Sequence, residues 1–192
     1  MDSHILLVLD LDETLIHARY SELDRQPNFT FNNYYFYKRP YLDEFLAECS
    51  NYYDLAVWSS AGDIYVQEVV RNIIAKSIRL EFSWGESKLV CSYSSEPWKM
   101  DVQYLKDLRK VVQKGFALDR ILIVDDDPEK LQRNYGNAIY VNKFYGAKND
   151  RELLMLTEYL KTLYNVGDVR KIEKRYWRQS VLNNKQTEVK NE

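Results

Sequence analysis

One short stretch, LLVLDLDETLIH from Leu6 to His17, restricts the possible folds more than any other part of the chain. It begins with four apolar residues in a row, where a strand with one face in water would alternate apolar and polar positions. An uninterrupted run is typical of a strand that is covered on both faces, as in a parallel sheet between helices. We therefore expect this stretch to begin with a central strand of an α/β fold.

Two aspartates one residue apart follow this apolar run. Because side chains alternate along a strand, Asp10 and Asp12 are expected on the same side at its carboxyl end. Two carboxylates held this close repel each other, so a cation, a proton or a bound phosphate with its metal must compensate. The pair predicts a nucleophile and a general acid/base beside a magnesium site.

Strand-like and helix-like segments alternate along the rest of the chain. Further buried strands are expected at 54–58, 121–124 and 138–141, and helices from Pro40 onward and at 65–75, 102–112 and 149–164. This alternation predicts an α/β, Rossmann-like fold with a parallel central sheet flanked by helices.

The expected organisation is a single domain over residues 1–178. Residues 18–37 are rich in polar and turn-forming residues and predict a flap loop, whose aromatic end at 34–37 suggests a strand near a sheet edge. Short aromatic and β-branched pieces at about 78–98 predict a small antiparallel β insertion. No large cap domain fits between the expected elements. The polar residues 179–192 predict a disordered tail.

Composition and charge narrow the function. The net charge of −2 gives no reason to expect nucleic acid as a partner. No segment approaches the 18 to 20 apolar residues of a membrane span, and the N-terminus lacks the pattern of a signal peptide. A cytoplasmic location is expected, with the nucleus as an alternative. His4 and His17, the only histidines, have no partner at zinc-ligand spacing.

Two other expected strands also end in polar residues. Ser59 and Ser60 follow the second buried strand, and Asp125 and Asp126 follow the third. The acidic end at Asp125 could by itself be a solvated loop, but three polar strand ends together point to one site. Carboxylate oxygens at such a point suit Mg²⁺, which binds one or two carboxylates together with water and a phosphate oxygen.

The motifs then become specific. The string DLDET at 10–14 resembles the DxDxT signature of the haloacid dehalogenase (HAD) superfamily of phosphatases. The longer string DLDETLIH, with KRP at 38–40 and YLKDL at 104–108, resembles the catalytic domain of the small carboxy-terminal-domain phosphatases, the NLI-interacting-factor-like family. The similarity runs from about Ile5 to Leu163, with these motifs in the family's order. It implies a HAD fold and a Mg²⁺-dependent phosphomonoester hydrolase.

The resemblance also implies roles for residues in the first two motifs. Asp10 would be the nucleophile that forms an aspartyl-phosphate, and Asp12 would serve as general acid and then general base. Thr14 would hold the loop geometry through its hydroxyl and belongs with the phosphate-binding residues. Ser59 would hydrogen-bond a phosphoryl oxygen, although a shift of one residue in the alignment gives this part to Ser60.

The later motifs supply a cation and further acids. Lys106 would neutralise charge on the phosphoryl group; Lys99 competes for this role, but the YLKDL string favours Lys106. Asp126, where relatives often carry Asn, would bind Mg²⁺ directly, and Asp125 would contact Lys106 or a metal-bound water. The implied metal site consists of Asp10, Asp12 through its backbone carbonyl, Asp125 and Asp126.

The family acts on phosphoserine or phosphothreonine in extended protein segments, which makes a phosphorylated protein the expected substrate. A small-molecule or nucleotide phosphatase of the same superfamily is the alternative, and a non-catalytic binding module with the same fold is a third possibility. The complete set of catalytic and binding residues argues against the third: Asp10, Asp12, Ser59, Lys106 and Asp126. The sequence gives no indication of an oligomeric state.

Three features have competing interpretations. Glu13 is interpreted as an exposed loop acid rather than a direct participant in catalysis, because it alternates with Asp10 and Asp12. For His17 a structural hydrogen bond is favoured. The basic segment from Arg170 to Arg178 fits a solvated terminal helix better than a docking surface.

Overall fold

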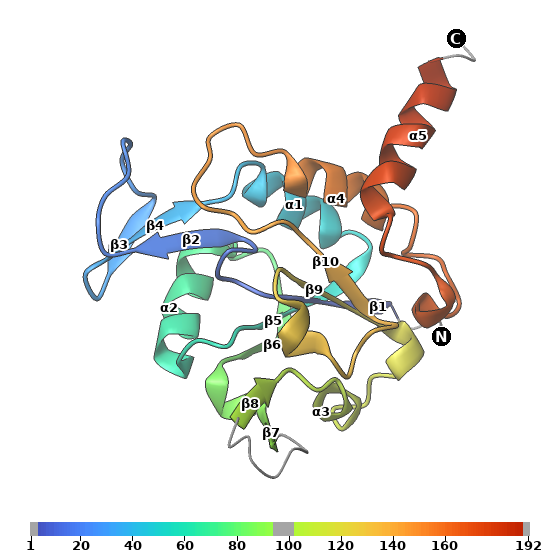
Figure 1. Cartoon of the computed structure of the whole chain (residues 1–192), viewed down its shortest axis with the longest axis horizontal. Coiled ribbons are helices and arrows are strands. Elements are labelled where there is room, and N and C mark those ends of the chain that lie inside the picture. Colours follow the sequence, from blue (N-terminus) through green and yellow to red (C-terminus); the bar gives the residue numbers. More distant parts are fainter. Residues whose placement is uncertain (1–3, 94–101, 190–192) are drawn as a thin grey trace.

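A five-stranded parallel sheet forms the centre of the molecule, in the order β10-β9-β1-β5-β6 (Figure 1). The computed structural model describes residues 4–93 and 102–189, with side chains described as far as 184. The strands of the central sheet are β1 (Ile5–Leu9), β5 (Tyr53–Trp58), β6 (Leu80–Trp84), β9 (Ile121–Asp125) and β10 (Ala138–Tyr140). The α/β class and the parallel central sheet are confirmed, and β1 is the middle strand of this sheet.

Both faces of β1 are covered, as its apolar run predicts. Leu7 and Leu9 pack in one core cluster with residues of α1 (Leu42–Cys49), α2 (Asp63–Ile73) and α4 (Glu152–Leu160). Leu6 and Val8 face the opposite cluster, which includes residues of α3 (Arg109–Val112) and the 3₁₀ helix η3 (Pro128–Leu131). All four side chains are fully buried. Each contributes about 2 kcal/mol of hydrophobic stabilisation, which fixes the strand that carries Asp10.

The predicted flap contains a loop at 20–28, but most of the rest of it is antiparallel sheet. This sheet consists of β2 (Ile16–Arg19), β3 (Phe29–Phe31) and β4 (Tyr34–Lys38) and extends from one side of the body (Figure 1). The strand expected at 34–37 is present as β4, but it lies between the other two strands rather than near an edge of this sheet. Asn32 and Asn33 both have positive φ and form the tight hairpin turn, which a polar composition does not distinguish from a longer loop.

The predicted β insertion begins later than expected. β6 joins the central sheet parallel to β5. The antiparallel part of the insertion that the structure describes is the pair of β7 (Val90–Tyr93) with β8 (Val102–Leu105). Residues 94–98 of the predicted insertion lie outside the described residues. The predicted helix at 102–112 is also wrong in its first half. Pairing with β7 makes residues 102–105 a strand, which shows how tertiary contacts override a helix-like pattern.

The C-terminal region differs from the disordered tail that was expected. Helix α5 (Trp177–Val189) occupies most of the segment predicted to be a disordered tail, and residues 190–192 lie outside the described part. Trp177 is buried, its ring lies 5.8 Å from that of Tyr159, and its Nε1 donates to the Tyr140 carbonyl at 3.0 Å. This anchor holds the first turn of α5, and the rest of the helix points away from the sheet (Figure 1). A polar composition gives no sign of one buried tryptophan.

Three short 3₁₀ helices complete the described structure: η1 (Glu86–Lys88), η2 (Leu118–Arg120) and η4 (Val169–Lys171). Within residues 4–93 and 102–189, no helix combines the length and the apolar character that a membrane crossing requires.

Candidate active site

The three polar strand ends meet at one edge of the central sheet. β1 pairs in parallel with β5 on one side and with β9 on the other, so Leu9 lies between Val57 and Val124. The residues that follow line a cavity of about 170 Å³, together with Lys106 from the other side. The lining residues are Asp10, Asp12, Ser59, Ser60, Ala61, Lys106, Asp125, Asp126, Asp127 and Lys130.

Cavity size alone does not locate this site. A larger cavity of about 470 Å³ lies beside α1 and the end of α2, and it shares no residue with the first. Its charged lining residues are Lys38 and Asp43, which form a 2.8 Å ion pair with each other. The cluster of acids and the buried lysine therefore distinguish the smaller cavity as the chemical site.

Lys106 joins two of the strand ends. Its Nζ donates to Asp10 Oδ1 at 2.5 Å and to Asp125 Oδ2 at 2.6 Å, and all three side chains are buried. Burial raises the pKa of Asp10 and of Asp125, and the charge of Lys106 opposes that rise. Burial would lower the pKa of Lys106, but the two carboxylates outweigh it and raise that pKa. Lys99, the other candidate, lies outside the described residues.

Lys106 begins the loop after β8, and hydrogen bonds from other segments hold it in place. The Lys106 backbone NH donates to the Lys130 carbonyl at 2.9 Å, and the Asn134 side chain binds both the Lys106 carbonyl and the Leu108 NH. Asn134 is buried, and nothing in its local sequence marks it as part of the site. Its contacts span nearly thirty residues, so only the packed structure identifies them.

Asp107 stabilises the same loop. It accepts hydrogen bonds from the Arg109 side chain and backbone and a 3.0 Å hydrogen bond from Arg133. Its carboxylate is almost completely buried, and the hydrogen bonds from Arg109 lower its pKa from 3.8 to about 2. A carboxylate with a depressed pKa stabilises the fold above its unfolded-state pKa, and this contribution is lost as the pH falls through the folded-state value.

We therefore expect Asp107→Asn to lower the free energy of unfolding by about 2 kcal/mol at pH 7, with a smaller deficit at pH 3. Urea denaturation at the two pH values measures the difference. Asp24→Asn, the same change at an exposed aspartate, is the control and should have little effect. A deficit that stays constant between pH 7 and pH 3 would show that the charge of Asp107 is not responsible.

Asp125 and Asp126 have different partners. Asp125 Oδ1 accepts from the Asp127 NH at 2.8 Å, and its Oδ2 is bound by Lys106. Asp126 Oδ1 accepts from Thr14 Oγ1 at 3.0 Å, and Lys143 Nζ lies 3.6 Å from its Oδ2. Thr14 is buried and does not line the cavity, so the geometry supports its part in holding the loop and gives no support for phosphate binding. Lys143 is a neighbour that the sequence did not indicate.

The acids of the site can hold a metal ion. Asp10, Asp125 and Asp126 each offer a carboxylate oxygen, and these oxygens lie within 4.8 Å of one another. Three carboxylates face one buried lysine, so a divalent cation would offset the remaining negative charge. Both oxygens of Asp125 already have hydrogen-bond donors, which makes Asp10 and Asp126 the better candidates for direct contact. Hard oxygen donors of this kind fit Mg²⁺.

Asp12 lies apart from this group and has hydroxyl partners instead. The Tyr65 hydroxyl donates to Asp12 Oδ1, and Ser59 Oγ lies 3.4 Å from Oδ2. Burial raises the pKa of Asp12, which these hydroxyls oppose. Ser59 Oγ also accepts from the Ala61 NH at 3.0 Å, and Ser60 lines the cavity beside it. The Asp12 carboxyl therefore has other hydrogen-bond partners than the three acids that could hold a metal ion.

Tyr65 is the clearest residue that the sequence analysis missed. It is the third residue of α2, where the expected amphipathic stripe drew attention to valines and isoleucines. Burial and the charge of Asp12 raise the pKa of Tyr65 above its usual range, so its hydroxyl remains a donor. Its distance from the DxDxT motif in sequence concealed this contact.

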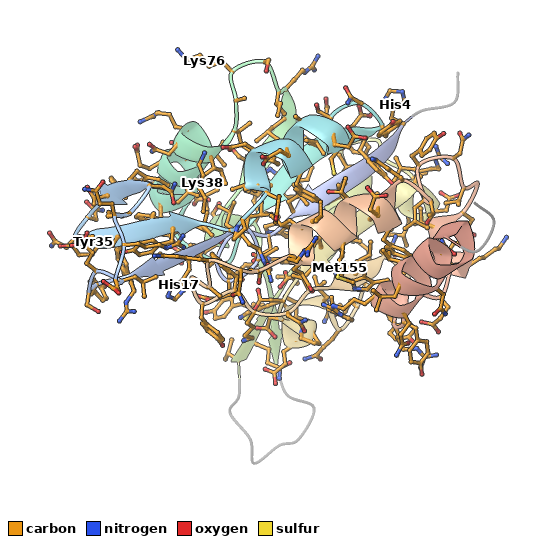
Figure 2. All side chains as sticks on the ribbon, turned by 90° about the horizontal axis from the view of Figure 1, so that it is seen from above. His4, His17, Tyr35, Lys38, Lys76 and Met155 are labelled. Atoms are coloured by element: carbon orange, nitrogen blue, oxygen red, sulfur yellow. The ribbon has the colours of Figure 1, made fainter. Side chains whose placement is uncertain are left out.

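Glu13 and His17 form a structural pair. His17 Nδ1 lies 2.9 Å from Glu13 Oε1, and the Glu13 carbonyl accepts from the Phe144 NH at 2.7 Å. Glu13 has a φ of 60° and does not line the cavity. The expected structural hydrogen bond of His17 is thus present, and Figure 2 shows His17 on β2, at the base of the antiparallel sheet.

Arg39 supports the loop that carries the two aspartates. Its buried guanidinium donates to the carbonyls of Thr14 and Asn142, each at 2.9 Å, and pairs with Asp150. The sequence indicates Arg39 only as part of the KRP string at 38–40, without a role of its own. The structure places it behind the DxDxT loop as a fixed support.

Comparisons with known proteins show which family this chain resembles. The sequence model of the NLI interacting factor-like phosphatases matches residues 5–170. CTD small phosphatase-like protein 2 of Dictyostelium discoideum is 32% identical over 174 residues, which cover 86% of this chain and 28% of that protein. A CTD nuclear envelope phosphatase 1 homolog of Drosophila melanogaster is 29% identical over 181 residues, which cover 86% of this chain and 70% of that protein.

A solved structure shares the fold. The fission yeast RNA polymerase II CTD phosphatase Fcp1-R271A, bound to beryllium fluoride, has a TM-score of 0.54 and 15% sequence identity over 95% of this chain and 50% of that chain. This likeness supports the fold alone. Nuclear envelope morphology protein 1 of Saccharomyces cerevisiae is 31% identical, and the chain spans only 40% of its length. With a family match over most of its length, the chain belongs to the NLI interacting factor-like phosphatases.

Proposed function

We propose that the chain is a Mg²⁺-dependent phosphomonoester hydrolase that acts through an aspartyl-phosphate, with phosphoserine or phosphothreonine in a protein as its substrate. The observation that carries this proposal is the buried lysine that bridges Asp10 and Asp125, with Asp12 held separately by hydroxyl groups. One carboxylate is thereby placed beside cationic charge, and the other is placed to exchange a proton. Membership of a phosphatase family supports the same reaction.

In the first step Asp10 attacks the phosphorus atom. A bond forms between a carboxylate oxygen of Asp10 and phosphorus, and the bond from phosphorus to the ester oxygen breaks. Asp12 gives its proton to the departing alkoxide, so this step requires a protonated Asp12. The raised pKa of Asp12 supports that protonation state.

In the second step Asp12 acts as a base. It takes a proton from a water molecule, whose oxygen attacks the phosphorus of the aspartyl-phosphate. The bond between phosphorus and Asp10 breaks, inorganic phosphate leaves, and both carboxyl groups return to their starting states. The Asp12 carboxyl thus donates a proton in the first step and accepts one in the second.

The remaining residues stabilise charge. Lys106 offsets the negative charge of the transferred group, and Ser59 or Ser60 offers a hydroxyl to a phosphoryl oxygen. Asp10 and Asp126, with the backbone carbonyl of Asp12, would hold Mg²⁺, and Asp125 would bind Lys106 or a metal-bound water. A bound Mg²⁺ supplies electrostatic stabilisation for the phosphoryl oxygens.

The shape of the site supports a macromolecular substrate. The cavity of about 170 Å³ suits a phosphate group, and no cap domain encloses the rest of a ligand in the part of the chain that the structure describes. A small-molecule or nucleotide phosphatase is the second candidate. The location in the cell, cytoplasmic or nuclear, belongs to the same proposal, since several relatives are named for the nuclear envelope.

The test is hydrolysis of a substrate panel by the purified chain. We expect release of phosphate from phosphoserine and phosphothreonine peptides in Mg²⁺, with kcat/KM at least about tenfold above that for sugar phosphates and nucleotides. EDTA should abolish the activity, because the excess negative charge of the site is then uncompensated, and added Mg²⁺ should restore it.

Activity that survives EDTA would contradict the magnesium part of the proposal. A preference for nucleotides or sugar phosphates would favour the second candidate. Complete inactivity on every ester in Mg²⁺, from a protein with cooperative unfolding, would instead indicate a binding module.

A further inference from the structure

We propose that Tyr65 is a positioning residue that aims the carboxyl group of Asp12 at the leaving group, and that this makes the site competent for alkyl phosphate esters. The inference rests on the proposed function, because it assigns a part to Tyr65 in the proton transfer by Asp12. Tyr65 does not itself exchange the proton; it acts through the carboxyl that does.

The position of Tyr65 is set by the protein on two sides. Its hydroxyl donates to Asp12 Oδ1, and its ring lies on the antiparallel sheet, 5.5 Å from the ring of Phe36 and 6.4 Å from that of Tyr34. Phe36 is fully buried and stacks on Phe29, so this support is rigid. The ring also packs against the main hydrophobic core. The hydroxyl is therefore held at a defined point beside the carboxyl.

This contact fixes the orientation of the Asp12 carboxyl group. The Tyr65 hydroxyl donates to Oδ1, and Oδ2 is the oxygen that Ser59 Oγ approaches at 3.4 Å. Ser59 lines the cavity, so Oδ2 is the oxygen on the cavity side. Tyr65 thus turns Oδ2 toward the place where the phosphate ester would lie.

The effect of such positioning depends on the leaving group. The alkoxide of serine or threonine is a strong base and leaves only when it is protonated, whereas an activated phenolate leaves without help. A misdirected proton therefore slows hydrolysis of alkyl esters far more than that of activated aryl esters. The ratio kcat/KM isolates this step, because it covers events up to formation of the aspartyl-phosphate and excludes the later hydrolysis.

The experiment compares Tyr65→Phe with the wild type on a series of substrates in Mg²⁺. The series runs from 4-nitrophenyl phosphate through phenyl phosphate to a phosphoserine peptide. We expect kcat/KM to fall by about 30-fold for the phosphoserine peptide and by less than about threefold for 4-nitrophenyl phosphate. Phenyl phosphate should lie between them.

Tyr34→Phe is the matched control. It removes the same atom from a neighbouring tyrosine whose hydroxyl donates to Tyr20, and it keeps the ring that touches Tyr65. Its kcat/KM should change by a similar small factor for every substrate. Thermal unfolding of both variants checks the fold, which Phe should preserve at each position because the ring contacts remain.

A double-mutant cycle supplies a second measurement. If Tyr65 acts through Asp12, Tyr65→Phe should have little further effect on the phosphoserine peptide in an Asp12→Asn background. Equal losses on all substrates, or effects that simply add in the double variant, would overturn the inference and indicate a packing role. In those cases wild-type turnover would leave the proposed function standing. An inactive wild type would overturn both.

Discussion

Asp10→Asn is expected to lower kcat for phosphate-ester hydrolysis by about 10⁴-fold or more, because the amide of asparagine is a poor nucleophile toward phosphorus. The loss should be the same for aryl and alkyl esters, since both must pass through the attack by Asp10. Steady-state turnover of 4-nitrophenyl phosphate and of a phosphoserine peptide in Mg²⁺ measures it. A phospho-enzyme should be absent from the variant on rapid acid quench.

The fold should survive this change. Asparagine is close to aspartate in size, and Lys106 keeps its 2.6 Å ion pair with Asp125. Asp43→Asn is a suitable control, because Asp43 lies on the surface of α1 and pairs with Lys38 outside the site. It should retain wild-type activity. Turnover by Asp10→Asn near the wild-type rate would rule out the aspartyl-phosphate mechanism.

Lys106→Met is expected to abolish activity and also to destabilise the protein, by about 3–5 kcal/mol at pH 7. The substitution keeps an unbranched side chain but leaves two buried carboxylates, Asp10 and Asp125, without their shared cation. Urea denaturation measures the loss of stability. EDTA is present so that no metal ion offsets the charge of the two carboxylates. Lys106→Arg keeps the charge and should destabilise less, with the difference between the two variants reporting the charge itself.

The destabilisation by Lys106→Met should depend on pH. Burial already raises the pKa of Asp10 and Asp125 in the wild type, and removal of Lys106 removes the main opposing effect. Groups whose pKa is higher in the folded than in the unfolded state bind extra protons on folding, so stability falls as the pH rises above about 4. The deficit should therefore be smaller at pH 4.5 than at pH 7. An equal deficit at both values would point to lost packing instead.

Much of the fold was predictable because its main signals are local. The apolar run before Asp10 predicted a strand covered on both faces, and Leu6 to Leu9 are buried between two separate clusters. The strand ends at Ser59 and Asp125 were also located correctly, since each follows a buried apolar run. Parallel pairing then brings these ends together without further information.

The errors arose where a segment's structure depends on a distant partner. Residues 102–105 have a helix-like pattern but pair with β7, and the polar segment after Trp177 forms a helix whose first turns are anchored by the buried Trp177 and Val181. The antiparallel flap sheet was mistaken for a loop because a two-residue asparagine turn is indistinguishable from other polar sequence. Local propensity does not predict the structure of such segments, because the energies of tertiary contacts are as large as the differences in propensity and can override them.

By itself, the sequence determined the strand of β1, the pair of acids at its end and the polar ends of the neighbouring strands, because these follow from patterns a few residues long. Only the tertiary structure decided which groups meet those acids. Lys106 reaches Asp10 across 96 residues of sequence, and Tyr65 reaches Asp12 across 53. Such contacts result from the packing of whole elements around the core. That packing determines that Asp10 pairs with a lysine and that Asp12 accepts a hydrogen bond from a tyrosine.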